Sequence, residues 1–257
     1  MFTVAALDLD DTLLRSDGSI SVRTLDALRA WRTKGNRIVI ATGRPRRTID
    51  TVLPLELSDA PLISYNGAEI HANGRKLYDN LIPAVAARAI VERCLALAPD
   101  AEIGVEIDNV LYLNRPSKRP RLYEVADLLE LTHQPCAKVL VFADELAVLD
   151  PLLAELPAGA RALHSGRYRF LQILGETVDK AEALRFLVAE WGLTMANVVA
   201  FGDDTNDVDM VRLSGLGVAM SNAVEEVLAV AHRVTTSNDE DGVALVLEEL
   251  LTASLNP

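Results

Sequence analysis

Short apolar runs that end abruptly in polar side chains constrain the fold of this chain more than any other feature. The runs Thr3–Leu7, Arg37–Ala41 (RIVIA), Pro61–Tyr65 (PLISY) and Asn197–Phe201 (NVVAF) consist largely of apolar residues. Strands that are apolar on both faces are typical of a parallel sheet with helices on both sides. The stretch Ser21–Lys34 lies between the first two runs, and its apolar residues recur every three positions, as on one helix face. We therefore expect an α/β fold built on a doubly wound parallel sheet.

The middle of the chain follows a different pattern. Glu102–Leu113 (EIGVEIDNVLYL) alternates around Asp108-Asn109, which is typical of a hairpin and hence of antiparallel pairing. We expect helices over Pro83–Ala98 and Leu122–Leu131, and a surface loop over Leu156–Arg161. This section predicts a small α+β domain.

The helix–strand alternation returns at about Val178. We expect a Rossmann-like core formed by residues 1–80 and 178–257, with the α+β domain inserted over residues 81–177, which is a plausible size for a small domain. Near the end of the chain, a helix over Asn222–Val230 is expected to begin with a capping pair of Asn222 and Glu225.

Composition excludes several classes of function. The 257 residues include 37 acidic and 25 basic side chains and carry a net charge of −12, which argues against broad nucleic-acid binding. No apolar run approaches the ~20 residues of a membrane helix, and Asp8 interrupts the first apolar run, against a secretory leader. Cys94 and Cys136 follow no metal-binding spacing. We expect a soluble cytoplasmic protein that binds neither nucleic acid nor membrane, with a monomer as the default.

Polar side chains gather where the expected strands end, and open α/β sheets bind their ligands beyond the carboxyl ends of the strands. These positions hold Asp8, Asp10 and Asp11; Thr42, Gly43 and Arg44; Asn66; and Asp203, Asp204, Asn206 and Asp207. Carboxylates without histidine or thiolate partners favour Mg²⁺ over zinc or copper. A calcium loop is excluded, because its sixth and twelfth positions, counted from Asp8, are Leu13 and Ser19 rather than glycine and glutamate.

Such a group of side chains suits a phosphate ester. A metal ion and a lysine neutralise the anion, so that one carboxylate can attack phosphorus, and a second can protonate the leaving oxygen and later activate water. Lys180 lies at the expected first turn of a helix, where the helix dipole disfavours a cation. An anion bound nearby would explain it, and a solvated lysine beside Asp179 and Glu182 would explain it equally well.

Several motifs, in this order, resemble the haloacid dehalogenase-like superfamily, and most closely its Cof-type sugar-phosphatase-like branch. They are Asp8-Leu9-Asp10-Asp11-Thr12-Leu13-Leu14, Thr42-Gly43-Arg44, Asn66-Gly67-Ala68, Lys180, Gly202-Asp203-Asp204-Thr205-Asn206-Asp207, Gly215–Ala223 and Ser237–Val243.

The resemblance implies a role for each matching residue. Asp8 would be the nucleophile that forms an aspartyl-phosphate and would also bind Mg²⁺. Asp10 would be the general acid and base and would give its backbone carbonyl to the metal. Asp203 would be a metal ligand, with Asp207 nearby directly or through water. The phosphate would be held by Thr42, Gly43 and Lys180, helped by the Leu9 backbone and Asn206.

The resemblance also implies that the inserted domain is a cap that closes over a small phosphorylated substrate. Arg44 is interpreted as a substrate contact or a surface arginine, Asn66 as a substrate contact or a turn residue, and Asp11 as a solvated or helix-capping carboxylate. We expect a Mg²⁺-dependent phosphatase acting on a sugar phosphate or a similar phosphomonoester. The alternatives are a phosphotransferase or mutase with the same nucleophile, a glycosyltransferase with a DxD metal site, and a Mg²⁺- or phosphate-binding module without turnover.

Overall fold

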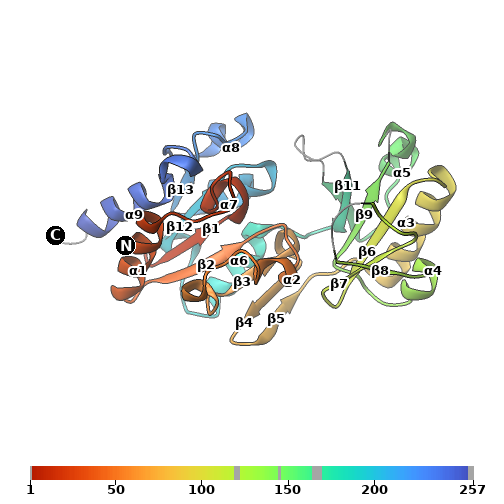
Figure 1. Ribbon diagram of the computed structural model, residues 1–257, viewed down its shortest axis with the longest axis horizontal. Helices are drawn as coiled ribbons and strands as arrows, with labels where there is room; N and C mark the ends of the chain where they lie inside the picture. The colour runs from red at the N-terminus through yellow and green to blue at the C-terminus, as the bar shows by residue number, and fades with distance from the viewer. Residues whose placement is uncertain (1, 119–121, 144–145, 164–169, 254–257) are drawn as a thin grey trace. The chain divides into compact units, whose positions relative to one another are not determined.

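The computed structural model describes residues 2–118, 122–143, 146–163 and 170–253 (Figure 1). The chain divides into two units. Met1–Tyr78 and Asp179–Pro257 form the first, called the core unit below, and Asp79–Val178 forms the second, called the inserted unit.

The core unit is built on an eight-stranded sheet in the order β14-β13-β12-β1-β2-β3-β4-β5. The first six strands in this order pair in parallel, and β4 is antiparallel to β3. The central strand β1 places Leu7 between Phe201 of β12 and Ile40 of β2. The strands are β1 (Val4–Leu7), β2 (Arg37–Ala41), β3 (Leu62–Ser64), β4 (Glu69–Ala72), β5 (Arg75–Asp79), β12 (Val198–Gly202), β13 (Leu216–Ala219) and β14 (Arg233–Val234). The predicted α/β fold with a parallel sheet is confirmed.

Helices cover both faces of this sheet, and for this reason the central strand β1 is apolar and buried at every position. In β1, Ala5 and Leu7 belong to a core with α1 and α9, whereas Val4 and Ala6 belong to a second core with α6. The helices of the core unit are α1 (Val22–Thr33), α2 (Arg46–Ile49), α6 (Lys180–Ala189), α7 (Val208–Leu213), α8 (Glu225–Val230) and α9 (Gly242–Ala253).

The inserted unit holds a six-stranded sheet in the order β10-β11-β9-β6-β7-β8, which is antiparallel except between β7 and β8. The predicted hairpin is confirmed: β6 and β7 meet at Asp108 and Asn109, whose φ angles of 48° and 66° suit a tight turn. The elements are β6 (Glu102–Ile107), β7 (Val110–Leu113), β8 (Glu124–Val125), β9 (Lys138–Phe142), β10 (Ala160–Leu163), β11 (Leu171–Gly175), α3 (Ala84–Leu97), α4 (Leu128–Leu131) and α5 (Asp150–Ala154). None of the helices among the described residues of either unit is long and apolar enough to cross a bilayer.

Two predictions for the inserted unit are wrong. A helix was expected over Leu122–Leu131, but the short strand β8 forms first and pairs with β7. The helix α4 begins only where the carboxylate of Asp127 accepts the backbone N–H of Leu129. The loop expected over Leu156–Arg161 ends early, because Ala160 already pairs with Gly175 as β10 joins the sheet edge.

Candidate active site

The polar residues that follow the core strands come together at one edge of the sheet. Asp8 directly follows β1, and its N–H still donates to the Phe201 carbonyl of β12 at 3.1 Å. Thr42 directly follows β2, and its N–H donates to the Ile63 carbonyl of β3 at 2.8 Å. The backbone hydrogen bonds of the sheet thus continue one residue beyond each strand, and they fix the backbone positions of Asp8 and Thr42.

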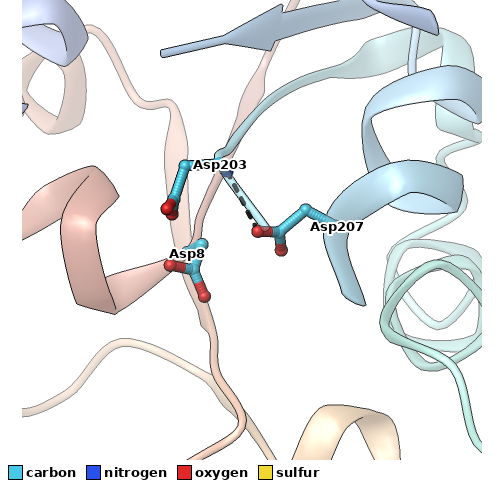
Figure 2. A group of neighbouring side chains, drawn as sticks. All are labelled: Asp8, Asp203 and Asp207. Carbon is cyan, nitrogen blue, oxygen red and sulfur yellow. Dashed lines mark hydrogen bonds between the residues drawn. The ribbon is translucent and has the colours of Figure 1, made fainter. Parts of the chain in front are cut away.

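Three of the carboxylates form a buried cluster, shown in Figure 2. Asp8, Asp203 and Asp207 each offer an oxygen that lies within 4.8 Å of the other two. Their residues are only 5%, 1% and 0% exposed. Burial raises the pKa of Asp8 well above its ordinary value, and although Lys180 opposes this shift, the charges of Asp207 and Asp203 add to it.

Lys180 supplies the positive charge inside this cluster. It is wholly buried, and its Nζ donates to Asp8 Oδ1 at 2.5 Å and to Asp207 Oδ1 at 2.7 Å. Burial alone would lower the pKa of Lys180, but attraction to Asp207 and Asp8 outweighs it and holds that pKa above its ordinary value. Lys180 is therefore an ammonium paired with two carboxylates, and the alternative of a solvated surface lysine is wrong.

The start of α6 brings Lys180 to this place. The carboxylate of Asp179 caps the helix by accepting the N–H of Ala181 at 2.7 Å. The turn that contains Gly67 packs directly against this cap: a Cβ at Gly67, whose φ is 104°, would lie 2.2 Å from the Asp179 carbonyl oxygen. Only glycine allows that approach.

The cluster carries more negative than positive charge. Three carboxylates against one ammonium leave a formal excess of two negative charges among side chains that are almost fully buried. Like charges buried this close require a cation or protons to relieve their repulsion. A hard divalent ion prefers carboxylate oxygens, so both the charge and the donor atoms of the cluster fit Mg²⁺.

Asp207 differs from the other two carboxylates in its contacts. Its Oδ1 accepts from Lys180, and its Oδ2 accepts the backbone N–H groups of Asp203 and Asp204 at 3.1 and 3.2 Å. A Cβ at Gly202 would lie 2.4 Å from the Asp207 Cβ, so the glycine makes room for this side chain. Asp207 thus joins Lys180 to the loop that carries Asp203.

A second group of predicted residues is linked through side-chain amides. Asn66 is 2% exposed, and its Oδ1 accepts from Asn206 Nδ2 at 2.8 Å. A Cβ at Gly43 would lie 2.7 Å from the same oxygen. Thr42 is fully buried, and its Oγ1 accepts the Arg44 N–H at 3.1 Å. Within the described part of the chain, Asn206 Oδ1 is buried without a hydrogen-bond partner.

The remaining predicted residues lie on a distorted helical turn, Leu9–Leu13, that follows β1. Leu9 is fully buried, its carbonyl accepts the Leu14 N–H at 2.8 Å, and Asp11 adopts a φ of 58°. Asp10 is part-exposed and lies outside the buried cluster, where its carboxylate is paired with Arg44. Arg44 was interpreted as a substrate contact or a surface arginine, and sequence reasoning missed this pairing.

Comparison with known proteins identifies the family. The family model described as haloacid dehalogenase-like hydrolase matches residues 5–247. This chain belongs to that family. The phosphatase YitU of Bacillus subtilis, named for 5-amino-6-(5-phospho-D-ribitylamino)uracil, is 29% identical over 95% of this chain and 96% of its own length. The pyridoxal phosphate phosphatase YbhA of Escherichia coli is 30% identical over 94% and 96%. The crystal structure of TM0651 from Thermotoga maritima has a TM-score of 0.85, at 29% identity, with 97% of each chain covered.

In this haloacid dehalogenase-like hydrolase, Asn222 and Asn238 form a set of hydrogen bonds, called the brace below, that sequence reasoning did not find. Asn222 Nδ2 donates to the Asp11 carbonyl at 2.8 Å, and Asn222 Oδ1 accepts the Asn238 N–H at 3.1 Å. Asn238 Nδ2 in turn donates to the Leu14 carbonyl at 2.9 Å. The brace ties the turn after β1 to two loops more than 200 residues away. The predicted capping pair of Asn222 and Glu225 is wrong, since the N-cap of α8 is Val224.

A hydroxyl adds a further support inside the cluster. Thr12, in the same distorted turn, donates from Oγ1 to Asp203 Oδ1 at 2.8 Å, and this bond is buried. Asp203 lies 191 residues from Thr12 in the sequence, so no local pattern could have identified this contact.

Proposed function

We propose that this hydrolase is a Mg²⁺-dependent phosphatase that cleaves a small phosphorylated metabolite, a sugar phosphate or a similar phosphomonoester, through an aspartyl-phosphate on Asp8. The observation that carries the proposal is the wholly buried ammonium of Lys180 between Asp8 and Asp207. A carboxylate held beside a fixed cation can approach an anionic phosphoryl group that would otherwise repel it. Two relatives that match nearly the whole chain, YitU and YbhA, are named as phosphatases of phosphorylated small molecules, which supports the same conclusion.

The reaction would proceed in two transfers. An Asp8 oxygen attacks phosphorus, the bond from phosphorus to the substrate oxygen breaks, and Asp10 gives that oxygen a proton, so that an alcohol leaves. Asp10 then takes a proton from water, the hydroxyl attacks the phosphorus of the aspartyl-phosphate, and inorganic phosphate leaves with the Asp8 carboxylate restored. Lys180 remains charged throughout and attracts the phosphoryl oxygens.

The metal would be held by Asp8, Asp203 and the backbone carbonyl of Asp10, with Asp207 beside it directly or through water. When bound, Mg²⁺ supplies positive charge that offsets the charges of the carboxylates and of the phosphoryl group. The hydroxyl of Thr12 orients the Asp203 carboxylate. Asp207 holds Lys180 and the Asp203 loop at a fixed distance.

The phosphoryl oxygens would also be bound by Thr42, Gly43, Asn206 and the Leu9 backbone. Asn66 would fix the orientation of the Asn206 amide. Thr42 already accepts a hydrogen bond through its oxygen, so its hydroxyl proton can be donated to a phosphate. Asn66 and Asn206 hold each other through one amide contact, which sets their orientation before a substrate arrives.

The inserted unit is proposed as the cap that selects the leaving group. Its sheet carries charged and polar side chains that are almost fully buried: Lys138 Nζ donates to Gln172 Oε1 at 2.7 Å, and Glu106 lies opposite Lys138 in the strand register. We also propose a monomer that acts in the cytoplasm, where the two cysteines, both buried and unbridged, remain reduced.

Phosphate release from an aryl phosphate, with and without Mg²⁺, tests the proposal. The wild type should release phosphate only with the metal, and Asp8→Asn should reduce release to background. Asp50→Asn, which changes an exposed aspartate after α2, is the matched control and should behave as wild type. Absence of metal-dependent release from this substrate and from a panel of phosphomonoesters would contradict the proposal and favour a binding module.

The phosphotransferase alternative predicts a different fate for the phosphoryl group. An added alcohol or sugar would then capture most of it, so that a phosphorylated acceptor exceeds inorganic phosphate. The hydrolase predicts that inorganic phosphate equals the alcohol released from the substrate, and chromatography of the products separates the two cases.

A further inference from the structure

The pair formed by Arg44 and Asp10 is a two-point side-chain contact to which the proposed reaction assigns no role. Arg44 Nε donates to Asp10 Oδ2 at 2.8 Å, and Arg44 Nη2 donates to Asp10 Oδ1 at 2.5 Å. This is the two-point geometry by which a guanidinium fixes the plane of a carboxylate. Within the described part of the chain, Arg44 provides every side-chain hydrogen bond of the Asp10 carboxylate.

The backbone on either side of Arg44 is itself fixed. Its N–H donates to Thr42 Oγ1 at 3.1 Å, and its carbonyl accepts the Tyr65 N–H at 3.2 Å. The Asn66 N–H donates to the Thr42 carbonyl at 3.0 Å, which closes the same loop. The Arg44 guanidinium therefore extends from a backbone segment that is held by three hydrogen bonds. Its partner Asp10 lies next to Asp11, which has a positive φ.

We propose that Arg44 is a positioning residue that orients the acid–base carboxylate of Asp10, rather than a direct ligand of the substrate phosphate. The proposal rests on the proposed function. Asp10 is one-third exposed, so without a partner its side chain would rotate among several orientations. Proton transfer requires the carboxyl group within hydrogen-bond reach of the leaving oxygen, and a displacement of ~1 Å can cost about 100-fold in rate.

The choice of arginine agrees with this role. A lysine at the same position would offer a point charge that fixes distance but not the plane of the carboxylate, whereas the planar fork of arginine fixes both. Because both Nε and Nη2 already face Asp10, a phosphate ligand would have to displace the aspartate to gain the same two contacts.

Substrates that differ in their leaving group test the proposal. A 4-nitrophenolate leaves without protonation, whereas an alkoxide must receive a proton as it leaves. The value of kcat/KM reports only the steps up to aspartyl-phosphate formation, in which Asp10 acts as the acid. We expect Arg44→Ala to lower kcat/KM by about 10- to 100-fold for an alkyl phosphate and by less than about threefold for 4-nitrophenyl phosphate.

A double-mutant cycle identifies the residue through which Arg44 acts. In the Asp10→Asn background, Arg44→Ala should cause no further loss with the alkyl phosphate, because the carboxylate it orients is absent. Arg44→Lys should recover part of the activity that Arg44→Ala loses. Arg46→Ala, which removes an exposed arginine two positions along, is the matched control and should match wild type on both substrates.

The opposite pattern would overturn the proposal. Equal losses on both substrates, a raised KM with unchanged kcat, or an additive loss in the Asp10→Asn background would each make Arg44 a phosphate ligand. These results would leave the phosphatase itself intact, because the wild type would still show turnover that depends on Asp8. Absence of wild-type turnover on both substrates would instead reject the proposed function, and this proposal with it.

Discussion

Replacing Lys180 by methionine tests whether charge inside the cluster holds the site together. Lys180→Met keeps much of the side-chain volume but removes the ammonium that contacts Asp8 at 2.5 Å and Asp207 at 2.7 Å. With charge centres ~4 Å apart and an effective dielectric constant of ~20, each attraction is worth about 4 kcal/mol. Removing the buried ammonium also removes its desolvation cost of several kcal/mol, so we expect a net loss of about 3–5 kcal/mol in the free energy of unfolding.

The loss should depend on pH with a definite sign. Lys180 has a raised folded pKa, so its contribution to wild-type stability is fully present below its ordinary value of 10.5 and is lost only at higher pH. In the variant, Asp8 loses the attraction that opposed its raised pKa. A carboxyl group with a raised folded pKa destabilises the protein increasingly as pH rises above its ordinary value of 3.8. Lys180 stays charged from pH 4 to pH 8, so only the titration of the carboxyl changes the deficit over this range, and the stability deficit of Lys180→Met should be smaller at pH 4 than at pH 8.

Urea unfolding in metal-free buffer, followed by tryptophan fluorescence, measures this deficit. The chain has two tryptophans, Trp31 and Trp191, and both lie in the core unit, so the signal follows that unit alone. Lys34→Met changes an exposed lysine at the end of α1 and should cost less than about 0.5 kcal/mol. A deficit below about 1 kcal/mol at pH 8, or one of the same size at pH 4, would refute the electrostatic reasoning.

Two further substitutions test the supports of the site. Asn222→Ala leaves a carbonyl and an N–H of the brace without their partner, and should lower the free energy of unfolding by about 1–3 kcal/mol in the same urea assay. If the urea midpoint of the Asn222→Ala variant equals that of the wild type, the hydrogen bonds of Asn222 do not contribute to the free energy of unfolding. Gly202→Ala places a methyl group 2.4 Å from the Cβ of Asp207, and should cost about 1–3 kcal/mol together with at least a tenfold loss of phosphatase activity. Unchanged activity would mean that the position of Asp207 is unimportant.

The core sheet was predictable because it depends on patterns that each segment carries by itself. Arg37–Ala41 was predicted as a strand and is β2, and the helix expected over Ser21–Lys34 is α1, which begins where the Ser21 hydroxyl accepts the Thr24 N–H. In the inserted unit, β8 and β10 were missed because short edge strands owe their extended form to a neighbour. The two residues of β8 exist as a strand only through pairing with β7.

The members of the site were predictable, but their contacts were not. Lys180 could be singled out from its place at a helix start, yet its partners Asp8 and Asp207 lie 172 and 27 residues away, and local sequence left a solvated lysine equally good. Arg44 shows the same limit. An arginine after a strand can face substrate, solvent or a carboxylate, and only the fold sets it opposite Asp10.

The contacts of Asp203 and Asp207 predict that these two carboxylates serve the metal differently. Asp207 accepts from the Lys180 ammonium through Oδ1 and from two backbone N–H groups through Oδ2, whereas Oδ1 of Asp203 accepts from the neutral Thr12 hydroxyl. A ligand that binds the folded state stabilises it by about 2.7 kcal/mol at 100 times its dissociation constant. We expect Mg²⁺ to raise the urea midpoint of the wild type, Asp203→Asn to abolish this rise, and Asp207→Asn to keep most of it while lowering the midpoint without metal.

Both variants should lose phosphatase turnover, so activity alone cannot separate the two roles, and the metal-dependent shift in the urea midpoint is the informative measurement. Loss of that shift in both variants would make Asp207 a direct ligand. Its contact with Lys180 would then have to open when the metal binds, because an oxygen that accepts from an ammonium at 2.7 Å is poorly placed to coordinate a second cation. If Asp207→Asn keeps the shift, the side-chain ligands of the metal are Asp8 and Asp203. Asp207 then serves to keep the buried Lys180 charged and in place.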